Sequence, residues 1–180
     1  KTKQPIEKSI AAPGLLAHIA VSKYADALPL YRQSTMFKRI GVELDRTSLA
    51  NWMIKCGQLV QPLFNRLQDY LLEQKLIHMD ETTLQVLNEP GKTAQSKSYM
   101  WVMATKTAAS PAVLFTYSAS RSADVPKTLL GDYSGALMVD GYEGYQGVCV
   151  ERNLTRLGCW AHARRKFVEA QRNQPKGKTG

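Results

Sequence analysis

The chain has 180 residues, of which 44% are apolar and 22% charged, so it can bury a core, and its composition excludes an intrinsically disordered protein. Its longest apolar runs are far shorter than the roughly 20 residues of a membrane-spanning helix. Three cysteines (Cys56, Cys149 and Cys159) without regular spacing indicate a reducing, cytoplasmic setting. The sequence opens Lys-Thr-Lys without a signal-like segment, so we interpret it as an internal fragment.

Charge is distributed unevenly along the chain, whose net charge is +9. Residues 1–75 carry +5, residues 76–150 carry −2 and residues 151–180 carry +6. Basic ends around an acidic middle suit a protein that binds a polyanion and keeps carboxylates for metal. Ordinary solvated charge explains the pattern equally well, so charge suggests nucleic acid without establishing it.

Helical signals dominate residues 1–75. An apolar stretch over 15–24 predicts one helix, and Pro29 opens a second that runs to residue 40 and stops at Gly41. Asp45 fits the N-cap of a third helix from Arg46, and Pro62 either kinks that helix or begins a fourth. Apolar residues at three- and four-residue steps predict two buried faces: Leu49, Trp52, Met53, Cys56 and Val60, then Leu63, Phe64, Leu67 and Leu71.

The second and third of these helices, joined by a short turn at 41–44, have the geometry of a helix-turn-helix motif. In that interpretation the third helix exposes side chains that bind DNA: Arg46, Ser48, Asn51 and Lys55. A plain helical bundle used for packing or dimerisation accounts for the same pattern, and both interpretations stay open.

The hydrophobic period changes to alternation at Leu76. Strands are predicted at 76–87, 98–105, 112–117, 136–139 and 154–160, and helices at 124–130 and 161–172. A short helical or turn segment is predicted at 142–148, and an unstructured tail from Pro175. The order predicts a mixed five-stranded sheet with flanking helices. The ribonuclease H-like fold has this order, with its first and fourth strands adjacent and parallel. We therefore expect an α+β chain with a helical region at 1–75 and a ribonuclease H-like domain at 76–180.

Two acids, sixty positions apart, should meet in that fold. Asp80 lies within the first strand and Asp140 ends the fourth. Neither strand contains Lys or Arg, and an ionised Asp on an apolar strand costs several kcal/mol unless it is paired or binds a cation. Carboxylates suit Mg²⁺ or Mn²⁺, and two such ions about 3.5–4 Å apart would activate a water or 3′-hydroxyl in phosphodiester displacement. Taken singly, each Asp is more often a strand-end cap or a surface residue.

Two further acids lie close to this pair in the sequence. Glu81 follows Asp80 and should leave the opposite face of the strand, as a supporting or structural group. Glu143 is near enough to Asp140 to reach the same site, but we expect it to be exposed.

Short motifs recur along the chain in a definite order. The second half contains Asp80-Glu81-Thr82, Val139-Asp140-Gly141-Tyr142 and a run from Gly158 through Cys159, Trp160 and His162 to Phe167; the first half contains the stretches 12–17, 22–24, 28–33 and 47–52. Together they resemble the insertion sequence 66 family of bacterial transposases, over about residues 10–172.

The resemblance implies a DDE-type DNA transposase that uses Mg²⁺ or Mn²⁺ for hydrolysis and strand transfer at element ends. Asp80 and Asp140 would be its first two catalytic, metal-binding acids. Its partners would be double-stranded DNA, both terminal inverted repeats and target, and further copies in a homo-oligomer. The family's third acid and its N-terminal zinc-binding segment have no counterpart here, and Glu169 does not match the Glu-bearing motif. We therefore expect a fragment that binds metal poorly and is inactive or nearly so.

Cys159 and His162 have the spacing of half a zinc site, but without a second pair no structural zinc is expected. The resemblance places them beside the active site, where an orienting or DNA-contacting role and simple packing are equally open. Trp101 and Trp160 are interpreted as core residues. Three basic residues on the last helix suit phosphate contacts: Arg164, Arg165 and Lys166.

Two other functions stay open. One is a non-catalytic DNA-binding or dimerisation module left by a decayed or truncated element. The other is a different ribonuclease H-like nuclease such as a junction resolvase, which would cut branched DNA without joining ends.

Overall fold

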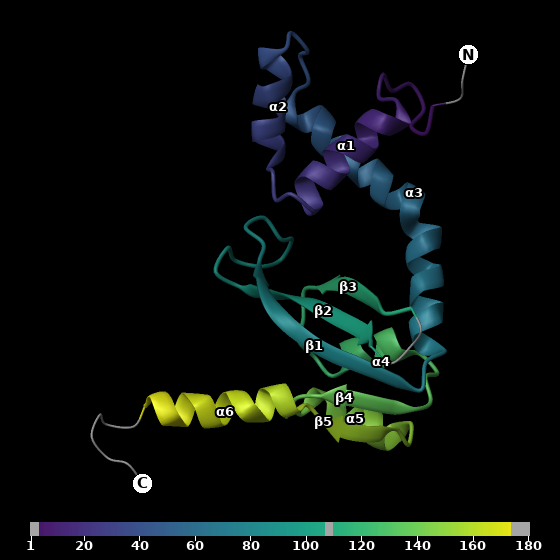
Figure 1. Cartoon of the computed structure of the whole chain (residues 1–180), viewed down its shortest axis with the longest axis vertical. Coiled ribbons are helices and arrows are strands. Elements are labelled where there is room, and N and C mark those ends of the chain that lie inside the picture. Colours follow the sequence, from purple (N-terminus) through teal and green to yellow (C-terminus); the bar gives the residue numbers. More distant parts are fainter. Residues whose placement is uncertain (1–3, 107–109, 174–180) are drawn as a thin grey trace. The chain divides into compact units, whose positions relative to one another are not determined.

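The structure is a computed structural model that describes residues 4–106 and 110–173. The chain divides into two compact units, Lys1–Asn65 and Arg66–Gly180. This division lies inside α3, whereas the predicted division after residue 75 lies where β1 begins. The elements follow the chain as labelled in Figure 1: α1 (Pro13–Tyr24), α2 (Leu30–Arg39), α3 (Arg46–Leu72), β1 (Leu76–Gln85), β2 (Lys97–Thr105), β3 (Ala112–Ser118), α4 (Asp124–Leu130), β4 (Ala136–Val139), α5 (Gly144–Glu151), β5 (Thr155–Gly158) and α6 (Trp160–Arg172).

The first unit surrounds a small apolar core with α1, α2 and the beginning of α3. Pro13 is the first residue of α1, where the missing N–H costs nothing. Gly41 follows α2 with φ of 81°, a left-handed backbone that glycine adopts without strain. The predicted helices are therefore confirmed, and the buried residues of this core are Ile6, Ala11, Leu16, Ile19, Leu44, Leu49, Trp52 and Met53.

Asp45 caps α3 as the sequence predicts. Its carboxylate accepts the Ser48 N–H at 2.9 Å and the Ser48 hydroxyl at 2.7 Å. The hydroxyl, and after it the backbone N–H, lowers the pKa of Asp45 below its ordinary value. The cap fixes where the turn after α2 ends and α3 begins.

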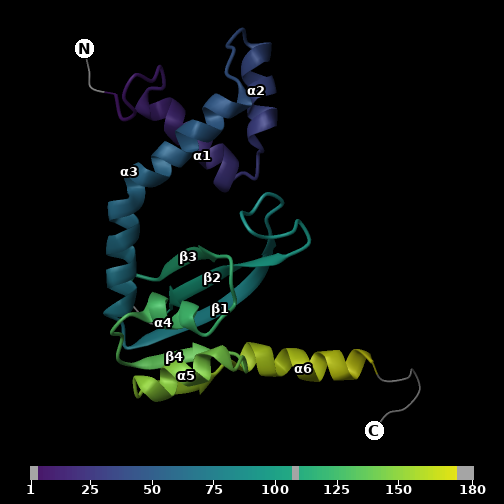
Figure 2. The same cartoon turned by 180° about the vertical axis from the view of Figure 1, so that it is seen from behind.

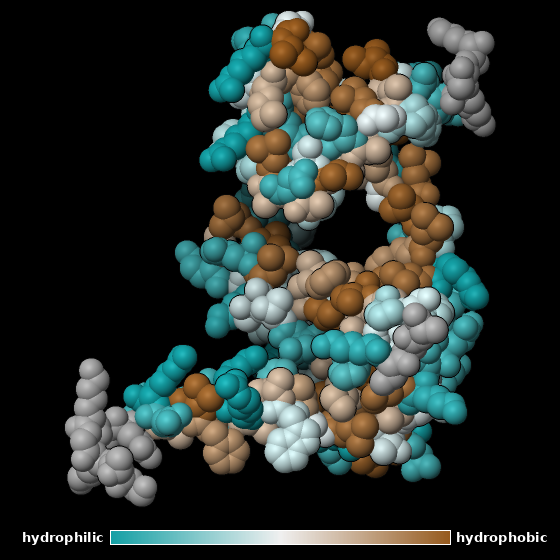
Figure 3. Space-filling model, viewed as in Figure 1, coloured by the Kyte–Doolittle hydropathy of each residue, from teal (hydrophilic) through white to brown (hydrophobic). Residues whose placement is uncertain are grey.

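Helix α3 runs unbroken from Arg46 to Leu72 with Pro62 inside it, so the separate fourth helix is not formed. The predicted buried faces are confirmed toward its ends, where Leu49 and Leu71 are fully buried. In the middle the prediction is wrong, since Val60 is 51% and Leu63 is 72% exposed. Figure 3 shows hydrophobic side chains on the surface along this helix. The reason is that the core of the first unit extends along α3 only as far as Cys56.

The five strands form one sheet in the order β3-β2-β1-β4-β5. The hairpin pairs β1–β2 and β2–β3 are antiparallel, while β4 is parallel to both β1 and β5. Parallel neighbours need a crossover connection, and α5 lies in the one between β4 and β5. The predicted mixed ribonuclease H-like sheet, with its first and fourth strands adjacent and parallel, is confirmed.

One face of this sheet holds the core of the second unit. Side chains alternate between faces along a strand, and those on this face are buried: Ile77, Met79, Trp101, Met103, Leu114, Leu137 and Val139. Helices α4 and α5 cover it (Figure 2), and Tyr145 of α5 meets Trp101 edge-on with ring centroids 6.1 Å apart. The other face carries Asp80, and there Phe115 of β3 is 60% exposed.

The remaining predictions agree with the structure to within a few residues. Helix α4 and strand β4 have their predicted bounds, and the segment predicted at 142–148 is α5. The tail predicted from Pro175 lies outside the described residues. None of the described helices has both the length and the apolar character needed to span a bilayer.

The connection between β1 and β2 contains a carboxylate with several partners. Glu89 accepts hydrogen bonds from Ser98 and Tyr117 and lies 3.6 Å from the Lys92 ammonium group. The Ser98 hydroxyl, and after it the Tyr117 hydroxyl, lowers the pKa of Glu89 below its ordinary value.

We expect Glu89→Gln to lower the unfolding midpoint at pH 7 and the difference to shrink as the pH falls below about 4. A carboxylate whose pKa is lowered on folding adds stability above its unfolded pKa, about 4.3 for Glu, and loses it as pH falls through the folded value. Thermal unfolding of the wild type and of Glu89→Gln, from pH 7 to below about pH 4, measures this difference in midpoint. Glu73→Gln removes an ion pair whose side chains are 70% and 59% exposed and should change little. A difference independent of pH would contradict the expectation.

Candidate functional site

The parallel pairing of β1 with β4 brings two aspartates together. The register joins Leu76 to Ala136, Ile77 to Leu137 and His78 to Met138. Continuing it by two residues puts Asp80 opposite Asp140, on the same face of the sheet. The juxtaposition expected from the sequence is therefore observed.

Each of these carboxylates accepts a hydrogen bond from a backbone N–H one or two residues further along the chain. The N–H of Glu81 donates to Asp80 Oδ1 at 2.9 Å, and the N–H of Tyr142 donates to Asp140 Oδ1 at 2.9 Å. One oxygen of each carboxylate is oriented in this way, which leaves the other, Oδ2, available to a ligand.

His162, in the first turn of α6, joins the two aspartates. Helix α6 starts at the end of β5, where the N–H of Cys159 donates to the Val139 carbonyl at 2.9 Å. The His162 Nε2 lies 3.4 Å from Asp80 Oδ2, an ion pair when the imidazole is protonated. One ligand atom from each of Asp80, Asp140 and His162 lies within 4.8 Å of the other two.

This donor set fits a divalent cation. Carboxylate oxygens suit Mg²⁺ and Mn²⁺, and an imidazole nitrogen adds a ligand that transition metals accept more readily than Mg²⁺. The His162 Nδ1 is buried, and no hydrogen-bond partner for it is found among the described residues. Across residues 4–106 and 110–173, this is the single group of three or more possible metal ligands, and Cys159 is not part of it.

The burial of the acids differs from what the sequence predicts. The Asp80 side chain is 52% exposed, so the expected cost of burying its charge on an apolar strand does not arise. The buried acid is its neighbour Glu81, whose side chain is 1% exposed and points to the opposite face, as predicted. Its cation, Arg121, comes from the loop after β3 rather than from β1 or β4.

The Glu81 carboxylate is fully engaged on that face. Its Oε1 accepts two hydrogen bonds from the Arg121 guanidinium, at 2.8 and 2.6 Å, and its Oε2 accepts the Tyr145 hydroxyl at 2.5 Å. Burial, and after it the bond to Glu81, raises the pKa of Tyr145, so the phenol remains a donor at neutral pH. The bonds to Glu81 also raise the pKa of Arg121.

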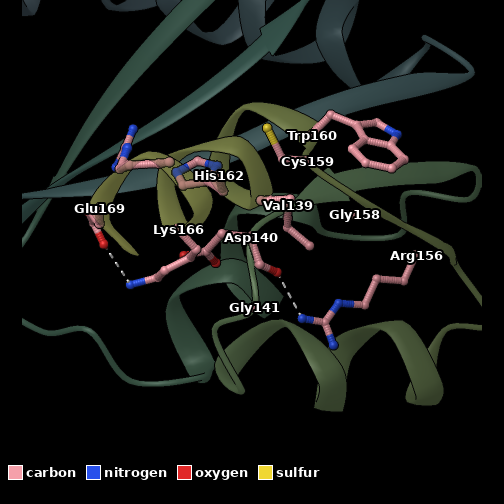
Figure 4. Close-up of a pocket in the computed structure, with 12 residues that line it drawn as sticks. Val139, Asp140, Gly141, Arg156, Gly158, Cys159, Trp160, His162, Lys166 and Glu169 are labelled. Atoms are coloured by element: carbon pink, nitrogen blue, oxygen red, sulfur yellow. Dashed lines mark hydrogen bonds and ion pairs between the residues drawn. The ribbon is translucent and has the colours of Figure 1, made fainter. Parts of the chain in front are cut away.

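A basic pocket of about 1020 Å³ opens beside Asp140 and His162 (Figure 4). Three cations line it, Arg156, Arg165 and Lys166. The Arg156 guanidinium donates to the Asp140 carbonyl at 3.0 Å. Glu169 lies in the same pocket and pairs with Lys166 at 3.5 Å. The arrangement can accept an anion next to the possible metal ligands.

The two tryptophans differ from each other in burial. Trp101 is fully buried, which confirms its predicted place in the core. Trp160 was also predicted to be a core residue, and it is 83% exposed. The prediction is wrong because Trp160 begins α6, a helix with no buried residue among its 13.

The predicted DNA-binding residues lie on two separate helices. In α3, the side chains of Arg46, Asn51 and Lys55 are exposed, while Ser48 is half-buried and its hydroxyl is bonded to Asp45. In α6 all three predicted cations are exposed: Arg164, Arg165 and Lys166.

The sequence interpretation missed three residues around the acids: Arg121, Tyr145 and Arg156. Arg121 lies in a loop without periodicity, so no pattern marks it. Arg156 and Tyr145 lie on predicted elements, but only the pairing of strands shows that they reach Asp140 and Glu81.

Comparison with known proteins identifies the family of this chain. Residues 8–180 match the family described as Transposase IS66 family. The chain belongs to this family. This IS66 family chain is 38% identical over 176 residues to the uncharacterized protein y4qI of Sinorhizobium fredii, covering 91% of the chain and 32% of that protein. It is also 38% identical over 175 residues to the uncharacterized protein y4jD of the same organism, covering 91% of the chain and 34% of that protein. The chain therefore spans about a third of the length of these relatives. No solved structure matches it significantly.

The three thiols of this IS66 family chain should differ in reactivity. The backbone N–H and then the ring of His162 lower the pKa of Cys159, whereas burial raises the pKa of Cys56 and of Cys149. Because the thiolate is the nucleophile, we expect iodoacetamide at pH 7 to alkylate Cys159 first. Peptide mapping by mass spectrometry gives the three rates. His162→Ala should slow Cys159 alone, and equal rates at all three thiols would contradict the assignment.

Proposed function

We propose that this chain carries part of the catalytic core of a DDE-type DNA transposase, with Asp80 and Asp140 as its first two metal-binding acids. The observation that carries the proposal is the convergence of Asp80, Asp140 and His162, whose ligand atoms lie within 4.8 Å of one another beside a pocket lined by Arg and Lys. Membership of a transposase family supports it.

The residues have separate roles in this proposal. Asp80 and Asp140 supply oxygen ligands, and His162 supplies a nitrogen ligand from Nε2. A bound Mg²⁺ or Mn²⁺ would supply Lewis-acid stabilisation of phosphodiester oxygens and would ease deprotonation of a water or 3′-hydroxyl nucleophile. Arg156, Arg165 and Lys166 would hold DNA phosphates beside these ligands.

The metal site of this chain should be weak by itself. Among the described residues no third carboxylate joins Asp80 and Asp140, and two carboxylates with one imidazole leave much of an octahedral shell to water and substrate. For the longer protein, we propose phosphodiester hydrolysis and strand transfer at element ends. We also propose that it is a homo-oligomer.

Titration calorimetry with Mn²⁺ tests the metal assignment. We expect weak binding by the whole chain, loss of that binding in Asp80→Asn/Asp140→Asn, and weaker binding in His162→Ala, because each change removes one or more ligands. Glu143→Gln is the matched control, since Glu143 is an exposed acid three residues from Asp140. Equal heats from the wild type and the double variant would remove the metal site from the proposal.

We also propose that α3 and α6 bind duplex DNA without requiring metal. The capped start of α3 after a short turn supports this. The proposed surface consists of exposed cations on both helices: Arg46 and Lys55 of α3, and Arg164, Arg165 and Lys166 of α6. A non-catalytic DNA-binding module would use the same residues. The exposed Leu59, Val60 and Leu63 on α3 would instead favour a dimerisation module.

DNA binding should be measured by fluorescence anisotropy against salt concentration, in EDTA. The affinity should fall steeply as salt rises, with a slope that loses about 0.9 for each phosphate contact removed. We expect Arg46→Ala/Lys55→Ala and Arg164→Ala/Arg165→Ala each to reduce the slope. Arg66→Ala, which removes a 70% exposed cation of α3 outside the proposed surface, should not. Absence of binding at low salt would favour the dimerisation bundle.

A further inference from the structure

The neighbours of Glu81 form a continuous set of contacts between the two aspartates. Glu81 follows Asp80 in β1, and Tyr142 lies two residues after Asp140. Arg121, from the loop between β3 and α4, contacts both Glu81 and Tyr142. With Tyr145 of α5, these residues make up what we call the brace: Glu81, Arg121, Tyr142 and Tyr145.

Arg121 makes three contacts that tie the brace together. Its guanidinium donates to Glu81 Oε1 through Nε and Nη2, at 2.8 and 2.6 Å. The same group lies over the Tyr142 ring, 4.0 Å from its centroid. Its backbone carbonyl accepts a hydrogen bond from the Tyr142 hydroxyl. A planar guanidinium can bond a carboxylate and stack on a ring at once, which a lysine ammonium cannot do in the same geometry.

Tyr145 anchors the other oxygen of Glu81. Its hydroxyl donates to Oε2 at 2.5 Å, and its ring packs edge-on against both Trp101 and Tyr142, with centroids 6.1 and 5.7 Å away. The space beside Tyr142 is also filled, because a methyl group added at Gly144 would overlap its ring. Glu81 is therefore fixed from two elements, and the Tyr142 ring is held between Arg121, Tyr145 and α5.

The brace ends at the two backbone amides that orient the aspartates. The N–H of Glu81 donates to Asp80 Oδ1, and the N–H of Tyr142 donates to Asp140 Oδ1, both at 2.9 Å. A change in the position of either residue therefore turns a carboxylate of the site. The buried ion pair lies on one face of the sheet, and its effect reaches ligands on the other face through these amides.

We propose that Glu81, Arg121, Tyr142 and Tyr145 are positioning residues that set the orientation of the Asp80 and Asp140 carboxylates. This inference rests on the proposed function, in which the two aspartates share a cation and must be oriented toward it. None of the four brace residues belongs to the group of possible ligands. Groups that orient metal ligands typically contribute 10- to 100-fold to metal affinity.

The test measures Mn²⁺ affinity by calorimetry and amide hydrogen exchange by NMR in EDTA, on the whole chain. The variants are Glu81→Gln, Arg121→Lys and Tyr142→Phe. The control is Lys127→Gln/Glu151→Gln, which removes another ion pair, of 2.5 Å, between α4 and α5. Thermal unfolding in EDTA records the stability of each protein.

We expect Glu81→Gln to weaken Mn²⁺ binding at least about tenfold and to speed exchange of the Tyr142 N–H by about tenfold, with the control unchanged in both. Arg121→Lys keeps the charge but loses the stacking on Tyr142 and the paired bonds to Glu81. Its effects on Mn²⁺ affinity and on Tyr142 N–H exchange should therefore lie between those of the control and those of Glu81→Gln. Tyr142→Phe removes only the hydroxyl bond of a half-buried side chain and tests the brace if Glu81→Gln does not fold. A merely structural role would lower the unfolding midpoint while folded molecules kept their Mn²⁺ affinity and amide exchange.

The outcomes separate this inference from the proposed function. If Asp80→Asn/Asp140→Asn abolishes Mn²⁺ binding while the brace variants bind like the control, the positioning role is overturned and the metal site stands. If the wild type does not bind Mn²⁺ through the aspartates, the metal site fails. In that case the Tyr142 exchange rate, which needs no metal, still decides whether the brace holds Asp140: unchanged exchange in all brace variants overturns it.

Discussion

The parallel pairing of β1 with β4 is the constraint on which the site depends. It joins segments that are sixty residues apart, and its register carries both aspartates to one face. The pairing is stabilised from the opposite face, where Ile77 and Leu137 are fully buried under α5 and its neighbours. The apolar core therefore determines the distance between two groups that are themselves polar and accessible. Core packing and site geometry use alternate residues of the same strands.

The fold constrains the three possible ligands to different degrees. The aspartates stand on or next to strands that are paired on both sides, whereas His162 stands on a helix without a buried residue. Segments with few buried apolar contacts open at low free energy. The fold therefore constrains the two carboxylates more tightly than the imidazole of His162.

Much of the fold and of the candidate site could be predicted from the sequence, because periodicity and turn residues depend on local interactions along the chain. Alternation located β1 and the opposite directions of Asp80 and Glu81, and the short apolar run before Asp140 located β4. Arg121 could not be found, since its loop has no period and its partner is forty residues away. The burial of Val60, Leu63 and Trp160 was predicted wrongly for one reason: an apolar residue on a helix is buried only where another element covers it.

The adjacency of Asp80 and Glu81 has a consequence for strand pairing itself. Because the side-chain period of a strand is two, sliding β1 by one position against β4 would exchange the two acids. Glu81 would then enter the solvent-facing position, and Asp80, shorter by one methylene, would be enclosed beneath the sheet and too short to reach Arg121. A misaligned strand would thus trap a charge that lacks its counterion, at a cost of several kcal/mol. Of these two alignments, only the native one pairs the enclosed acid with Arg121.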